Sequence, residues 1–192
     1  MAVLTGVAGL LANVLLILFF GLARPFDGWA SEFDWLGPAN DSVIVVQFAA
    51  LVPVALALRA RVPGPLARWA TAVGVAAMTA VVTLQLMLVT GLVPFEVQVG
   101  PVVGCLAVTF GWLLAVNRAG RRSLPRPLVR FGTAVGVSYL AGLGIAGSAL
   151  LLPGGSDGQY VVFGLAIAIG LFGWLGFPVW PLLARRVLRE ER

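Results

Sequence analysis

The chain has 192 residues, of which 60% are hydrophobic and only 11% are charged, and its mean hydropathy is +1.00. A water-soluble domain of this length, with its usual ~25% of charged residues, has too little interior to hide so much apolar surface, so the composition excludes that class and predicts a membrane protein. The net charge of +5 comes from 13 basic residues, all arginine, whose placement beside apolar segments argues against a nucleic-acid-binding protein.

Six long apolar segments follow one another along the chain. Each approaches the ~20 residues that a helix needs to cross ~30 Å of hydrocarbon. They cover residues 2–22, 42–58, 69–93, 97–117, 131–152 and 160–183. Pro53 and Pro178 predict kinks in the second and sixth segments. We therefore expect an all-α membrane protein with six transmembrane helices in a single domain, residues 1–192.

The charged residues sort the connections between these segments into two alternating sets. Twelve of the 13 arginines lie in one set and in a basic tail, residues 185–192, whereas Arg24 is the lone cation in the other set, which carries six acids. Because connections rich in arginine stay in the cytoplasm, we expect a multi-pass protein of the plasma membrane with both termini cytoplasmic.

An internal repeat is visible at an offset of 62 residues. The segment Leu66–Val75 is similar to Leu128–Val137, and Phe110–Leu113 recurs as Phe172–Leu175. This pattern predicts three tandem two-helix hairpins, at about residues 1–60, 61–123 and 124–186, related by an axis along the membrane normal. Chance similarity within a biased composition is the alternative.

The connection after the first segment has aromatic residues at helical spacing. Phe26, Trp29, Phe33 and Leu36 would share one face, and Gly37 and Pro38 would end the element. This spacing predicts a short amphipathic helix on the outer surface of the membrane.

The outer connections bring together the acids and aromatic residues that are our main candidates for a site. Acids beside aromatic faces suit the binding of a cation, and a partly desolvated acid can donate a proton. An aromatic belt at the interface with solvated acids is the simpler explanation. The candidate acids are Asp34, Asp41, Glu96 and Asp157, and the candidate aromatic residues are Trp29, Trp35, Phe95 and Tyr160.

Neutral polar residues within the apolar segments form a second group of candidates. Gln47 is expected near the outer end of the second segment, and Asn13 and Gln85 are expected deeper in the membrane. Polar groups at such depth are functional candidates, although hydrogen bonds between helices also explain them. Cys105 is the only cysteine and histidine is absent, so we expect no metal site and no cofactor.

Two short stretches carry a resemblance to known proteins. Residues Trp35–Asp41 and Phe177–Leu182 resemble stretches of small six-span membrane proteins of actinobacteria, which implies the six-span plan but no activity. The hairpin plan is also similar in outline to the short-repeat acid-resistance membrane proteins.

Three functions fit these features. The first is a non-enzymatic protein that binds or moves an apolar or cationic small molecule, or assists a membrane partner. The alternative is an acid-catalysed enzyme on a lipid-soluble substrate, such as a terpene cyclase, with Asp34, Asp41 or Glu96 as the acid. The third is a subunit that docks a partner through the basic residues 118–130, which also suit contact with anionic membrane lipid.

The predicted topology has a direct test. A tag inserted after Arg122 should be unreachable by a label added outside intact cells, and should react once the membrane is permeabilised, because the arginine-rich connections stay in the cytoplasm. Labelling of this tag in intact cells would reverse the predicted orientation.

Overall fold

Helices make up nearly all of the chain in the computed structural model, which describes residues 1–24 and 31–189. No strand occurs within these described ranges. The elements are α1 (Ala2–Leu18), η1 (Phe19–Ala23), α2 (Leu36–Arg61), α3 (Pro65–Val89), α4 (Phe95–Ala119), η2 (Gly120–Arg122), α5 (Arg126–Ala149), α6 (Asp157–Gly176) and α7 (Val179–Arg189).

Six of the helical stretches are long and apolar enough to cross a membrane, which confirms the expected number of spans. They run through Ala2–Ala23, Leu36–Arg61, Pro65–Val89, Phe95–Arg122, Arg126–Ala149 and Asp157–Leu188. Each overlaps one of the apolar segments in the sequence, so hydrophobic length alone located the helices. The chain therefore has the make-up of a multi-pass membrane protein.

The second span begins earlier than its hydrophobicity indicates. Gly37 and Pro38 lie in the first turn of α2, so the prediction that they end a separate surface helix was wrong. Proline is tolerated there because the first N–H groups of a helix have no acceptor within it. Residues 31–35 form a turn, and Phe26 and Trp29 of the predicted amphipathic helix lie outside the described residues.

The sixth span is interrupted where the sequence predicts only a kink. Helix α6 ends at Gly176, residues Phe177 and Pro178 form a turn, and α7 starts at Val179. The Pro178 ring nitrogen has no hydrogen to donate to the carbonyl of Trp174, so the regular helix stops there. Helix α7 then buries Trp180 and Ala184 on one face, while Arg185 is exposed on the other.

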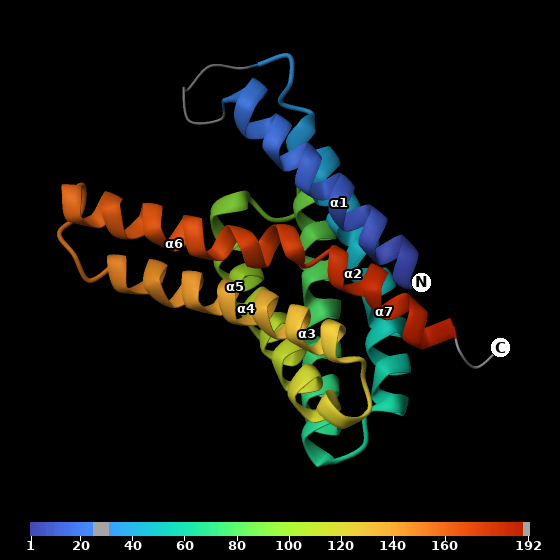
Figure 1. Cartoon of the computed structure of the whole chain (residues 1–192). Coiled ribbons are helices and arrows are strands. Elements are labelled where there is room, and N and C mark those ends of the chain that lie inside the picture. The colour runs from blue at the N-terminus through green and yellow to red at the C-terminus, as the bar shows by residue number, and fades with distance from the viewer. Residues whose placement is uncertain (25–30, 190–192) are drawn as a thin grey trace.

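Successive helices pack against one another in chain order, and α7 closes the arrangement against α1 (Figure 1). Helices α5 and α6 lie side by side and project away from the other helices (Figure 1). Within the described chain, α6 packs chiefly on α5, and its buried residues are only Ala166, Gly173 and Gly176.

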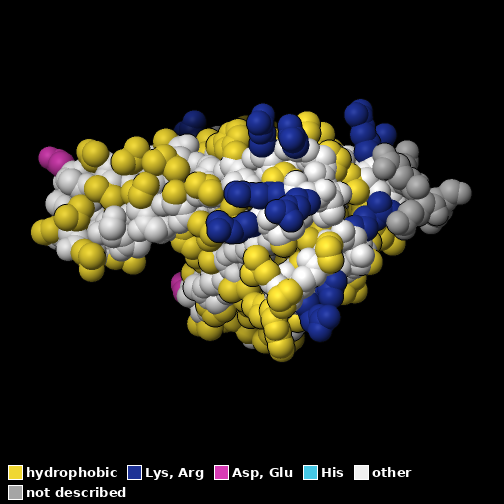
Figure 2. All heavy atoms as spheres, turned by 60° about the horizontal axis from the view of Figure 1, so that its bottom comes forward, with side chains coloured by type: hydrophobic (Ala, Val, Ile, Leu, Met, Phe, Trp, Pro, Cys, Tyr) yellow, Lys and Arg dark blue, Asp and Glu magenta, His cyan; other side chains and the backbone are white. Residues whose placement is uncertain are grey.

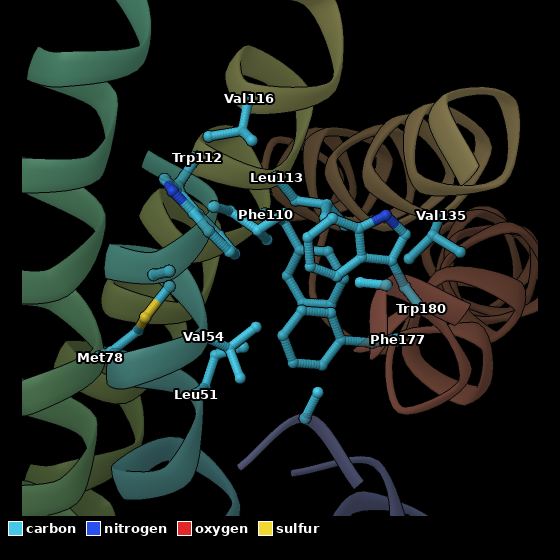
Figure 3. Packing of buried hydrophobic residues seen from close by; sticks show 14 of the residues in the cluster. Leu51, Val54, Met78, Phe110, Trp112, Leu113, Val116, Val135, Phe177 and Trp180 are labelled. Carbon is cyan, nitrogen blue, oxygen red and sulfur yellow. The ribbon is translucent and has the colours of Figure 1, made fainter. Parts of the chain in front are cut away.

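Aromatic side chains fill the centre, where α2, α4, α5 and α7 meet (Figure 3). The Phe110 ring stacks on Tyr139 with 3.8 Å between centroids, and it also contacts Phe177 at 4.8 Å. Trp112 and Trp180 meet edge to face at 5.8 Å. The turn between α6 and α7 is therefore anchored in the core by the residues on both sides of Pro178.

The predicted repeat has unequal surroundings in the structure. Phe110 is fully buried, whereas its counterpart Phe172 is 52% exposed. Trp112 donates a hydrogen bond to Thr71 Oγ1 at 3.4 Å, but the indole N–H of Trp174, the counterpart of Trp112, has no partner among the described residues. The threefold hairpin plan stays a prediction, because similar sequences here occupy a central helix in one case and a peripheral helix in the other.

Glycine permits the close approach of α5 and α6. A Cβ atom on Gly142 would lie 2.6 Å from the Gly170 Cα atom and 2.7 Å from the Ala166 carbonyl oxygen. Ser138 donates to the Ile169 carbonyl, and its Oγ accepts from the Gly173 N–H at 3.0 Å. Small residues that bring backbones together are the usual contact between helices in lipid, where apolar side chains gain little by leaving the tails.

This contact predicts a difference between two neighbouring glycines of α5. Gly142→Ala should lower the free energy of unfolding by about 1–3 kcal/mol, because its methyl group meets backbone atoms that cannot rotate away. Gly144→Ala should change it by less than about 0.5 kcal/mol, since a Cβ atom there meets nothing within 4 Å. Unfolding in mixed micelles of mild detergent and dodecyl sulfate measures both, and equal losses would contradict the importance of the contact.

Candidate functional site

The predicted outer site residues lie at the ends of several helices. Asp34 is exposed and accepts a hydrogen bond from the Ser31 N–H at 3.0 Å, and Glu96 is exposed in the first turn of α4. Trp35 and Phe95 are also exposed, and Trp29 lies outside the described residues. Asp41 is half-buried near the start of α2, where its carboxylate accepts a hydrogen bond from Asn40.

Asp157 and Tyr160 belong to the far end of the projecting α5–α6 pair. Both are exposed in the first turn of α6, and an acidic side chain marks the tip of this pair in Figure 2. The acids of the described chain form no group of three that would hold a metal ion. Convergence of the outer acids and aromatic residues on a single site remains a prediction.

Gln85 has a partner that the sequence analysis missed. It lies about one turn before the end of α3 rather than in the middle of that helix, and it accepts a 2.9 Å hydrogen bond from the Gln98 amide of α4. Both side chains are buried, so their hydrogen bond links α3 to α4 inside the protein. This hydrogen bond agrees with the structural explanation of Gln85, and a part of Gln85 in ligand binding stays a prediction.

Gln47 lies nearer the middle of its helix than the sequence predicts. Because α2 starts at Leu36, Gln47 lies almost halfway along that helix and not near its outer end. Its side chain is buried, yet its amide makes no hydrogen bond with any described residue. A Cβ atom on Gly9 of α1 would lie 2.5 Å from the Gln47 Nε2 atom and 2.7 Å from Pro178 Cγ, so Gln47 sits beside the break between α6 and α7.

Two further buried amides lie along the same contact between α1 and α2. Gly9 meets Gln47 and Phe19 meets Gly37, and this antiparallel register places Asn13 between the levels of Asn40 and Gln47. The Asn13 Nδ2 atom and the Asn40 Oδ1 atom are buried without a hydrogen-bond partner in the described structure. We call Asn13, Asn40, Gln47 and Pro178 the amide seam.

The amide seam combines features that are costly inside a membrane. A buried polar group without a partner loses its hydrogen bonds to water and gains none, at a cost of ~1–3 kcal/mol. The helix break adds to this cost, because the Trp174 carbonyl loses the donor that residue 178 provides in a regular helix. The Pro178 carbonyl oxygen also comes within 2.8 Å of a Cβ atom built on Gly6. The Asn40 Oδ1 atom has no donor among the described residues. Side-chain and backbone oxygens that still have a free lone pair can accept a cation or a hydrogen-bond donor.

A second buried polar group was not foreseen. Asn117 of α4 and Trp180 of α7 are fully buried, and a Cβ atom on Gly132 would lie 2.4 Å from both the Asn117 Nδ2 and the Trp180 Nε1 atoms. Asn117 donates to the Leu113 carbonyl of its own helix at 2.7 Å. The sequence signal was an asparagine beside arginines at the end of an apolar segment, which is easily assigned to the connection.

Comparisons with family models, with curated proteins and with solved structures found no match to this chain. The arrangement of its own residues therefore carries the functional argument.

The two buried glutamines predict opposite effects on stability. Gln85→Leu should lower the free energy of unfolding by about 1 kcal/mol, because it leaves the Gln98 amide without its partner. Gln47→Leu should leave the free energy unchanged or raise it, since it removes an amide that makes no hydrogen bond with a described residue. Unfolding in mixed micelles compares the two, and an equal loss in Gln47→Leu would show that its amide is satisfied.

Proposed function

We propose that the chain is a non-enzymatic membrane protein that binds and moves a small cationic molecule at the amide seam. The observation that carries this proposal is the break at Pro178 beside the unpaired Gln47 amide, about halfway along α2. Interrupted helices and polar groups near the midplane are the usual construction of a substrate site in transporters. The oxygens of Gln47 and of the Pro178 carbonyl would replace part of the hydration shell of the cation.

The distribution of charge supports a cation as the ligand. Every described acid, Glu32, Asp34, Asp41, Glu96 and Asp157, lies in or near the connections opposite those that hold most of the arginines. Asp41 is hydrogen-bonded to Asn40, which is the first residue of the amide seam from that side. A cation attracted to the acidic end would thus meet Asp41, then Asn40 and Asn13, and finally Gln47.

Movement of the ligand would require α7 and α1 to separate. Gly6 and Gly9 of α1 leave no free space against Leu182, Pro178 and Gln47, so the seam is closed in this arrangement. The turn at Phe177–Pro178 is the point at which α7 can rotate relative to α6, since no continuous helix joins them.

A membrane-bound acid-catalysed enzyme is not favoured. Asp34 and Glu96, two of its three candidate acids, are exposed. Acid catalysis on a lipid-soluble carbocation needs an apolar chamber that excludes water. Exposed carboxyl groups at helix ends do not supply such a chamber.

The projecting α5–α6 pair favours a second role, that of assisting a membrane partner. Small residues on this pair, Gly144, Gly147 and Gly164, meet nothing within 4 Å. Such residues usually mark a helix contact rather than a surface toward lipid. This role agrees with the resemblance to small six-span proteins, which implies no activity.

Ligand binding by purified protein tests the main proposal. We expect at least one of choline, ethidium and tetraphenylphosphonium to raise the melting temperature of the protein in detergent micelles. Gln47→Leu should weaken the binding of that cation at least about tenfold. The reason is that the interaction of an amide oxygen with a charged ligand contributes more binding free energy than a hydrogen bond between neutral groups. Flux of the same cation into proteoliposomes should fall in the variant as well.

Gln85→Leu is the matched control, since it alters a buried glutamine on a different helix contact. It should lower stability and leave the affinity for the cation unchanged. The proposal fails if none of the cations shifts the melting temperature, or if both variants weaken binding equally.

A further inference from the structure

A groove along α4 and α5, at their arginine-rich ends, has no part in the function proposed above. It consists of two adjoining hollows of about 480 Å³ and about 570 Å³, which share Arg121, Thr133 and Val137. We call it the basic groove. Its charged and hydroxyl-bearing lining consists of Arg118, Arg121, Arg126, Arg130 and Thr133.

The four arginines of the basic groove have no protein partner. All are exposed, and none makes a hydrogen bond or ion pair with a described residue. Arginine side chains gather on the body of the molecule in Figure 2, whereas the projecting pair is covered mainly by apolar side chains. Arg118 and Arg121 line one hollow, and Arg121, Arg126 and Arg130 line the other. Positive charges gathered along adjoining hollows repel one another, so an anion bound among them is favoured.

The groove continues from these charges along an apolar wall. Leu66, Leu114, Ala115 and Val137 line it beyond the arginines. At Gly111 it adjoins a hollow of about 360 Å³ between α3 and α4, which is lined by Trp69 and Val73. Trp69 is 70% exposed near the start of α3, where an indole suits the headgroup level of a bilayer.

We propose that the basic groove binds one anionic phospholipid. Its phosphate lies among Arg118, Arg121, Arg126 and Arg130, because the guanidinium fork matches phosphate oxygens in pairs. One acyl chain runs along the apolar wall toward Gly111. A free phosphate or a nucleic acid would use the charges alone, whereas a phospholipid matches both the charged end and the apolar end.

Native mass spectrometry of the whole protein tests this site. Detergent-solubilised protein is mixed with dioleoyl phosphatidylglycerol or with dioleoyl phosphatidylcholine, and the retained lipid is counted. We expect one phosphatidylglycerol to be retained in clear preference to phosphatidylcholine. Arg121→Gln combined with Arg126→Gln should weaken this binding about thirtyfold, given the usual contribution of each arginine at a membrane surface.

Two matched controls separate a built site from general attraction. Arg68→Gln combined with Arg186→Gln removes the same charge from exposed positions outside the groove, and should weaken binding by less than about threefold. Gly111→Leu should displace the acyl chain and weaken binding while every arginine remains, and Gly104→Leu should not. Neither glycine has a neighbour within 4 Å of an added Cβ atom. Equal melting temperatures of the two variants check that the larger leucine side chain is accommodated in both.

Four results would overturn the proposal. The first is equal retention of the two lipids, and the second is equal weakening by the two arginine pairs. The third is an unchanged affinity in Gly111→Leu, which would leave only a charged patch. The fourth is displacement of the lipid by inorganic phosphate at an equal concentration, which would assign the arginines to a soluble anion.

Discussion

Close contact between helices, made possible by glycine, is the constraint on which the rest of the structure depends. In hydrocarbon the apolar side chains gain little by leaving the lipid, so helices adhere only where their surfaces fit closely. Gly9 admits Gln47 and Pro178, Gly74 admits the Trp112 side chain, and Gly142 brings two backbones together. Each of these contacts places a larger side chain or a backbone segment where a methyl group would prevent it. The amide seam therefore exists because α1 has no side chain at Gly9.

The break at Pro178 shows how one fold accommodates a costly irregularity. Phe177 and Trp180 lie on either side of the proline, and both are buried against aromatic side chains from other helices. Their burial compensates for the interrupted backbone, and the turn also keeps hydrogen bonds from the Phe177 N–H to the Gly173 carbonyl and from the Trp180 N–H to the Phe177 carbonyl. The same turn carries α7 back to α1 and leaves α6 with few neighbours. The break at Pro178 thus separates the part of the sixth span that packs on α5 from the part that packs on α1.

Hydrophobic length located the spans because lipid demands an unbroken apolar stretch from each helix. Hydrophobic length did not predict the helix boundaries, because a helix can extend beyond its apolar residues. Because α2 starts at Leu36, Gln47 lies near the middle of that helix. Because α3 ends at Val89, Gln85 lies near the end of its helix. The sequence also did not predict which polar side chains pair, because no local pattern indicates that Gln98 is the partner of Gln85. Arginine placement indicated a basic surface but not a groove, because the hollow depends on Gly111 and on the packing of α4 against α5.

The contact between α1 and α7 has a consequence for synthesis. These two segments are separated by almost the whole described chain, so their mutual surface cannot form until the ribosome has released α7. Until then, the part of α1 that meets Gln47 of α2 can already pack, whereas the part that meets Pro178 and Leu182 lacks its neighbour. This contact would thus form late in assembly, after the helices that lie between α1 and α7 in the sequence have been made.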